Sequence, residues 1–157
     1  MNRRWITMNI KEKLASKKSP KVQGAYSAGI KTCEQIFLSG QLPIDPMTHT
    51  IVDGGIYQQT KQCLENMKTL LQECGLDMKY VVKTTVFLKD LNDLEEMDKV
   101  YAQYFAEPYP ARTCCEICRL RHDALIEIEA TVIDFRALEV LCMEEEEECD
   151  GKSCCCK

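Results

Sequence analysis

The order in which strand-like and helix-like patterns follow one another constrains the fold of this chain more than any other feature. Alternating or β-branched segments predict strands, and apolar residues at helical spacing predict helices. The order is strand, strand, helix, strand, helix, strand, strand, over residues 25–32, 35–42, 56–74, 80–90, 92–105, 111–120 and 125–133. This order leaves few parallel crossovers, so it predicts an α+β fold in which two helices cover one face of a mixed sheet.

Turn and capping residues indicate where the two helices begin and end. Gly75 follows the first helical pattern and is expected to stop that helix. Asn92 and Glu95 have the spacing of a capping box, which predicts the start of the second helix. Asp98 lies at the edge of the apolar stripe of this second helix, where an ordinary solvated flank residue is the alternative to a functional role.

Length and charge predict one domain with two charged ends. A chain of 157 residues suits a single core, and its net charge of −5 combines a basic start with an acidic end. We expect a basic extension over residues 1–9, the domain over 10–135, and an acidic, cysteine-rich tail over 136–157 that is disordered. No apolar run is long enough for a membrane span or a secretory signal, so a cytoplasmic protein without membrane contact is expected.

The cations at the start of the chain raise the question of nucleic acid. Arg3, Arg4 and Lys11 belong to a basic arm that could contact RNA. Scattered cations at a terminus are usually solvated, so RNA is not the expected partner.

Eleven cysteines raise the question of disulfides or a metal site. A reducing cytosol disfavours disulfides. Cys115 and Cys118 form one C-x-x-C pair, but no second pair follows at zinc-finger spacing. In the tail, Cys149 and residues 154–156 could bind zinc or Cu(I), although their low-complexity surroundings argue against a functional site. No functional metal site is therefore predicted.

The last two predicted strands carry charged residues among apolar ones. Alternation places Glu127 and Glu129 on the face opposite Ile126 and Ile128. The preceding strand is expected to bury Cys115 and Ile117 and to direct Arg112, Cys114, Glu116 and Cys118 to the other face. Solvent exposure is the preferred explanation for Glu116 and Glu129, because antiparallel sheets often have one wet face.

For Arg112 and Glu127 a polar cleft is the alternative to solvent exposure. Tyr26, Ser39 and Gly40 are polar or small residues that could join them there. The chain shows no Ser-His-Asp or Cys-His pattern and no glycine-rich phosphate loop, and its two histidines fall in predicted turns. The residues alone therefore indicate an α+β domain with an anion-binding cleft.

Several motifs together resemble a known family. They are "GAYSAGI", "FLSGQLPIDP", "QTKQCLENMKTLLQECGL", "VVKTTVFLKDLNDLEEMDKVYAQYF", "PARTCCEICRL" and "ALIEIEATVI". In this order, from about Ile10 to Ile133, they resemble the RidA (YjgF/YER057c/UK114) family of reactive-intermediate deaminases. The resemblance implies a chorismate-mutase-like fold, a homotrimer with three clefts between subunits, and no cofactor. It also implies hydrolysis of enamines and imines, such as 2-aminoacrylate and 2-iminobutanoate, to 2-oxoacids and ammonia.

The resemblance assigns roles to particular residues. The family's carboxylate-binding arginine matches Arg112 in "PAR", and its acidic residue matches Glu127 in "IEIEA". Its tyrosine matches Tyr26 in "GAY", and its small polar residue beside a glycine matches Ser39 and Gly40. The resemblance thus implies catalytic roles for Arg112, Glu127 and Tyr26, and substrate binding by Arg112, Ser39, Gly40, Cys114 and Asp98.

Two departures from the family pattern affect the expected substrate range. Asp98 stands where related proteins often have asparagine, and its negative charge is expected to weaken the binding of an anionic substrate. "RLRHDA" lacks the proline of the commoner "RLP-x-x-A". Two other functions remain as alternatives, a non-catalytic regulatory trimer that binds 2-oxoacids and an endoribonuclease or translation inhibitor. The presence of both Arg112 and Glu127 favours the enzyme.

Overall fold

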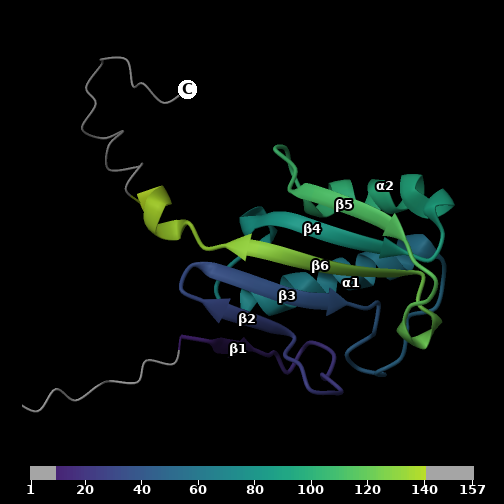
Figure 1. Ribbon diagram of the computed structural model, residues 1–157, viewed down its shortest axis with the longest axis horizontal. Coiled ribbons are helices and arrows are strands. Elements are labelled where there is room, and N and C mark those ends of the chain that lie inside the picture. Colours follow the sequence, from purple (N-terminus) through teal and green to yellow (C-terminus); the bar gives the residue numbers. More distant parts are fainter. Residues whose placement is uncertain (1–9, 141–157) are drawn as a thin grey trace, which may run out of the picture.

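The computed structural model describes residues 10–140, which form a six-stranded mixed sheet in the order β1-β2-β3-β6-β4-β5 (Figure 1). The strands are β1 (Glu12–Leu14), β2 (Gly29–Thr32), β3 (Gln35–Gln41), β4 (Val81–Leu88), β5 (Ala111–Glu116) and β6 (Ile126–Ile133). Neighbouring strands are antiparallel except β4 and β5, which are parallel. Both helices, α1 (Ile56–Gln72) and α2 (Leu94–Tyr104), lie on the same face, behind the sheet in Figure 1. The predicted α+β class and mixed sheet are confirmed.

The helix α1 supplies a large share of the core. Its buried stripe includes Leu64, Met67, Leu70 and Leu71, all 0% exposed, which pack against the sheet and α2. Burying each such side chain contributes about 1.5–3 kcal/mol. Gly75 has a φ of +68°, so it takes the left-handed conformation that ends the helix, as predicted.

The start of α2 differs from the prediction. The carboxylate of Asp90, not a capping box at Asn92 and Glu95, accepts a hydrogen bond from the backbone N–H of Asn92 at 2.8 Å. This contact begins a 3-10 turn over Leu91–Asp93, and the α-helix follows at Leu94. The predicted capping box is therefore wrong, because Asp90 caps the 3-10 turn before the helix. The predicted end near residue 105 is confirmed.

The two faces of the sheet follow from the strand register. Thr84 on β4 is 0% exposed beneath the helices, and it pairs with Arg112 on β5 and with Ala130 on β6. Arg112 and Cys114 therefore lie on the helix-covered face of β5, whereas Cys115 lies on the open face.

The prediction that β5 buries Cys115 and Ile117 is wrong. Both are only half-buried, and Cys114 is the β5 residue that packs against the core. The sequence "ARTCCE" contains no apolar alternation that would fix which face of this edge strand is buried.

The N-terminal strands show one confirmed and one missed element. Antiparallel β2 and β3 form the predicted hairpin. Strand β1, which lies within the lysine-rich N-terminal segment, pairs with β2 and buries Leu14. It was missed because three residues among lysines and glutamate give too short a pattern.

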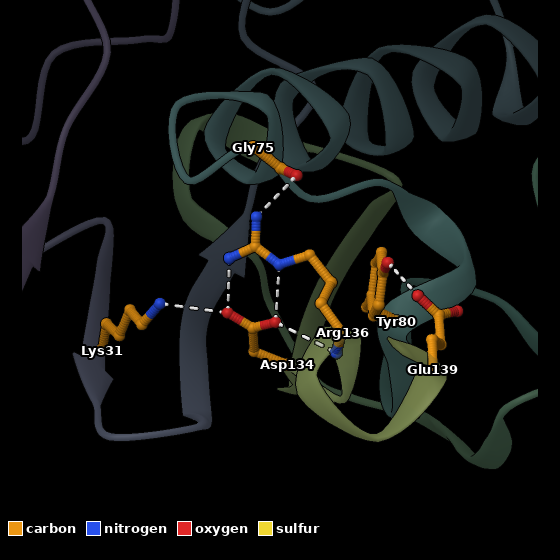
Figure 2. A network of polar contacts seen from close by, with 6 residues as sticks. All are labelled: Lys31, Gly75, Tyr80, Asp134, Arg136 and Glu139. Carbon is orange, nitrogen blue, oxygen red and sulfur yellow. Dashed lines mark hydrogen bonds and ion pairs between the residues drawn. The ribbon is translucent and has the colours of Figure 1, made fainter. Parts of the chain in front are cut away.

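A network of polar contacts fixes the segment after β6 to the domain (Figure 2). Arg136 donates to Asp134 at 2.7 and 2.6 Å and to the carbonyl of Gly75 at 3.3 Å, and Lys31 reaches Asp134 at 3.2 Å. Hydrogen bonds from Arg136, followed by that from Lys31, lower the pKa of Asp134. Glu139 accepts hydrogen bonds from the hydroxyl of Tyr80 at 2.9 Å and from a lysine ammonium. Residues 136–140, assigned above to the acidic tail, thus form a helical turn attached to the domain.

Residues 1–9 and 141–157 lie outside the described residues, and so do Arg3, Arg4 and the tail cysteines. Within residues 10–140, no helix is long and apolar enough to cross a membrane. The same range contains no cluster of three or more histidine, cysteine, aspartate or glutamate side chains placed to hold a metal ion.

Candidate functional site

Arg112 lies at the start of β5, where its guanidinium stacks on α2. The guanidinium carbon is 4.9 Å from the centre of the Tyr101 ring, a distance typical of a cation–π contact. The Tyr101 hydroxyl is 2.8 Å from Oγ1 of Thr84, which fixes the ring on the sheet. The position of the arginine therefore depends on a buried tyrosine and threonine as well as on β5.

Asp98 binds Arg112 directly. Both guanidinium NH₂ groups contact the two carboxylate oxygens of Asp98, and the hydrogen bond through NH1 is the shorter. This hydrogen bond raises the pKa of Arg112 further above its ordinary value. From the sequence, Asp98 could have been an ordinary solvated residue at the flank of the helix. In the structure its carboxylate contacts Arg112, the predicted carboxylate-binding arginine.

The Arg112–Asp98 pair opens into a cavity of about 380 Å³. Its other walls are Tyr101, Ala102, Tyr109 and Pro110. Tyr109 is 50% exposed, so its ring forms part of the rim. The pair itself stays accessible, with 27% of the Arg112 side chain and 46% of the Asp98 side chain exposed. A small charged molecule in this cavity would meet both groups.

Cys114 lies two residues after Arg112 on the same face of β5. Burial raises the pKa of the Cys114 thiol, although the charge of Arg112 opposes this effect. A thiol that stays protonated is a poor nucleophile, so Cys114 is suited to forming a wall, not to attacking a substrate.

Glu127 lies on the other face of the sheet, near the start of β6. It pairs with Phe87 of β4. Because side chains alternate along each strand, this pair faces away from the helices. Its carboxylate packs over Gly40 of β3 so closely that a Cβ atom on Gly40 would lie 1.8 Å from Oε1. Gly40 is therefore needed to give the Glu127 side chain its place.

The surroundings of Glu127 favour its protonated form. Burial raises the pKa of Glu127, the negative charge of Glu129 raises it further, and Arg121 lowers it. A carboxyl group with a raised pKa keeps its proton to higher pH than an ordinary glutamate does. Glu127 is thus the candidate acid–base group of this site.

Ser39 directly precedes Gly40 in β3, and Tyr26 belongs to the segment before β2 that Ser39 contacts. The hydroxyl of Ser39 donates to the carbonyl oxygen of Ser27 at 2.7 Å, so Ser39 ties the segment that carries Tyr26 to β3. Tyr26 is 48% exposed and lines a small hollow of about 50 Å³ with Arg121 and residues 49 and 122, both histidines. Arg121 both lines this hollow and, through its charge, lowers the pKa of Glu127.

The predicted site residues therefore form two groups within one chain. The first group, on the helix-covered side of the sheet, is Asp98, Arg112 and Cys114. The second group consists of Glu127 on the opposite face, Gly40 against its carboxylate, Ser39 beside Gly40, and Tyr26 on the segment that Ser39 contacts. Because Arg112 and Glu127 project from opposite faces of one sheet, they cannot both touch one small molecule bound to a single chain.

Sequence reasoning missed three residues that shape these groups. Tyr101 was not singled out, although its position three residues after Asp98 places both on one helix face. Tyr109 directly precedes the "PAR" motif, which was the available signal for the cavity rim. Arg121 lies in the "RLRHDA" departure, and nothing in the sequence indicated its effect on Glu127.

The fold and these residues define a class of protein, a small α+β domain with a mixed sheet, helices on one face and a cavity centred on an accessible arginine. Residues 16–134 match the family model described as Endoribonuclease L-PSP. The chain belongs to this family, the RidA (YjgF/YER057c/UK114) family, as the motifs predicted.

Individual relatives agree with this assignment. The RutC family protein PYRAB12510 of Pyrococcus abyssi is 51% identical over 120 residues, which cover 76% of this chain and 94% of that protein. The human 2-iminobutanoate/2-iminopropanoate deaminase is 38% identical over 124 residues, 79% of this chain and 90% of the human protein. The solved structure of the Escherichia coli YjgF gene product superposes with a TM-score of 0.73 at 37% identity, covering 78% of this chain and 98% of that one.

Proposed function

We propose that this protein is a 2-iminobutanoate/2-iminopropanoate deaminase, which hydrolyses reactive enamine and imine acids to 2-oxoacids and ammonia. The observation that carries the proposal is the Glu127 carboxyl group, half-buried, raised in pKa and seated against Gly40. Two relatives at 38% identity, from Homo sapiens and Salmonella typhimurium, carry this deaminase name, which supports the same activity.

Arg112 is the group that binds the substrate carboxylate in this proposal. A guanidinium matches a carboxylate with two parallel N–H···O bonds, and its stacking on Tyr101 limits the orientations available to it. The cavity of about 380 Å³ beside it suits a small planar acid.

Glu127 supplies the proton transfers. The enamine takes a proton at carbon to give the imine, water then adds to the imine carbon, and ammonia leaves the resulting carbinolamine. The net reaction consumes one water and releases one ammonia. Glu127 is the acid and base for these steps through a water molecule, with Tyr26 as its hydroxyl partner.

In this proposal the two groups meet between chains, because within one chain they project from opposite faces of the sheet. Arg112 of one subunit and Glu127 of a neighbour would meet in a cleft between subunits, and cyclic symmetry would repeat that cleft. We propose a homotrimer with three such sites. Light scattering at micromolar concentration is expected to give three times the monomer mass, whereas a monomer would contradict the assembly and the site together.

The test of the activity couples a threonine dehydratase to chemical trapping of the imine. Addition of this protein is expected to reduce the trapped product and to speed 2-oxobutanoate formation, and Glu127→Gln is expected to abolish the effect. Binding of 2-oxobutanoate without any acceleration would instead support the regulatory alternative, a non-catalytic trimer that binds 2-oxoacids.

Endoribonuclease activity is the second candidate, since the family model carries that description. One observation favours it. His49, His122, Arg121 and Lys21 line the hollow beside Tyr26, and imidazoles with cations can bind phosphate and move protons. RNA cleavage that is lost in His49→Ala and His122→Ala but kept in Arg112→Ala would favour this function over the deaminase.

A further inference from the structure

We propose that Asp98 makes the Arg112 cavity selective for zwitterionic acids, with a cationic nitrogen beside the carboxylate, over 2-oxoacids of the same skeleton. The inference deepens the proposed function and rests on it in one respect, that Arg112 binds a carboxylate. It identifies the protonated imine as the preferred substrate form and makes Asp98 a residue that determines specificity.

The first step is that the arginine can hold Asp98 and a ligand together. A guanidinium has five N–H donors, and Asp98 engages the NH1 and NH2 groups. Within the described chain, no side chain accepts a hydrogen bond from Nε of Arg112. The edge formed by Nε–H and the neighbouring N–H can therefore receive a ligand carboxylate while Asp98 stays in place.

The second step is that both charges line one accessible cavity. Arg112 and Asp98 share the space of about 380 Å³ with Tyr101 and Tyr109, and neither of the charged side chains is buried. A ligand carboxylate on Arg112 lies within a few ångströms of the Asp98 carboxylate. A ligand with only a negative charge meets attraction from one group and repulsion from the other.

The third step concerns the atom attached to the second carbon of the ligand. In an iminium or amino acid this atom is a cationic nitrogen that donates hydrogen bonds, which Asp98 can accept. In the 2-oxoacid product it is a neutral oxygen, which can only accept and therefore gains nothing from a carboxylate. Asp98 thus stabilises the bound substrate and weakens the bound product, which favours product release.

The test compares L-2-aminobutanoate with 2-oxobutanoate by isothermal titration calorimetry; the two share one carbon skeleton and a carboxylate and differ at the second carbon. Asp98→Asn is expected to tighten the binding of 2-oxobutanoate about tenfold, because it removes a charge that repels this anion. It is expected to weaken the binding of L-2-aminobutanoate about tenfold, because it removes a charge that attracts the ammonium group. The affinity ratio of the two ligands then changes about 100-fold.

Glu96→Gln is the matched control, since it removes the same charge from an exposed position two residues away on α2 and facing another direction. It is expected to leave the ratio unchanged. An unchanged ratio in Asp98→Asn, or no binding of either ligand to the wild type and to Asp98→Asn, would overturn the inference. If Asp98 controls the affinity ratio but the protein does not hydrolyse imines, the inference on selectivity stands and the proposed deaminase activity is wrong.

Discussion

Replacing Gly40 with alanine tests whether the position of Glu127 matters for catalysis. The added Cβ would lie 1.8 Å from Oε1 and 2.7 Å from Cδ of Glu127, and real Cβ atoms essentially never approach a neighbour below 3.0 Å. Oε1 must therefore move by at least 1.2 Å, the difference between 3.0 and 1.8 Å. The backbone at Gly40 has no positive φ, so alanine causes no strain of its own.

The displacement is large enough to affect proton transfer strongly. A misplacement of about 1 Å in a catalytic group can lower the rate roughly 100-fold, which corresponds to about 2.7 kcal/mol of transition-state stabilisation. The cost to folding is expected to be smaller, because the three contacts below 3.0 Å are with Oε1, Cδ and Cγ of the Glu127 side chain and none is with backbone. Activity and stability are thus expected to separate in Gly40→Ala.

Two other glycines provide matched controls for this variant. A Cβ on Gly29 would lie 2.8 Å from a Leu38 methyl and 3.2 Å from the carbonyl oxygen of Phe37, so Gly29→Ala is expected to lower Tm and to keep kcat/KM per folded molecule. Gly55 has nothing within 4 Å, so Gly55→Ala is expected to change neither quantity strongly.

The assay measures kcat/KM for imine hydrolysis and Tm by circular dichroism for all three variants. Gly40→Ala with wild-type kcat/KM would refute the reasoning, since the carboxyl group cannot remain where it is beside a Cβ atom.

Further variants test the remaining contacts. Arg112→Ala is expected to cost about 2–5 kcal/mol in kcat/KM, and Arg112→Lys to recover only part of it because the planar fork is lost; equal activity of all three proteins would exclude Arg112 from binding. Glu129→Gln removes a charge that raises the pKa of Glu127, so the limb of the pH–kcat/KM profile that Glu127 sets is expected to move to lower pH, and an upward shift would contradict this. Asp134→Asn is expected to lower Tm by a few degrees at pH 7. Because the folded pKa of Asp134 is lowered, its contribution is present above the unfolded pKa of about 3.9 and lost as pH falls through the folded pKa, so the Tm difference should shrink in acid.

Much of the fold could be predicted because its elements carry regular patterns. The stripe of α1, the end at Gly75 and the alternation of β6 each repeat over enough residues to indicate element and face. The elements that were missed or misread are short or lack apolar alternation. Strand β1 has three residues, and β5 reads "ARTCCE".

The identity of the site residues could be predicted, but their contacts could not. Motifs indicated Arg112 and Glu127, because those motifs resemble a known family. The pairing of Arg112 with Asp98 depends on how β5 lies against α2, and the seat of Glu127 depends on the approach of β3 to β6. Such contacts join segments that are far apart in the chain, where local periodicity carries no information.

The open face of the sheet gives a physical reason for assembly. In β4 and β6, the residues that face away from the helices include Phe87, Glu127 and Thr131, and β3 adds Phe37, which is 47% exposed. The helices α1 and α2 cover only one face of the sheet (Figure 1), so these aromatic side chains lie on the face that the helices leave open. Covering the open face with copies of the chain would bury these aromatic side chains and bring Glu127 against neighbouring subunits. The same contact would bury the Glu127 carboxyl group further and raise its pKa, which strengthens its role as an acid. Assembly and catalysis are therefore expected to depend on the same surface, and a substitution such as Phe37→Glu should reduce both together.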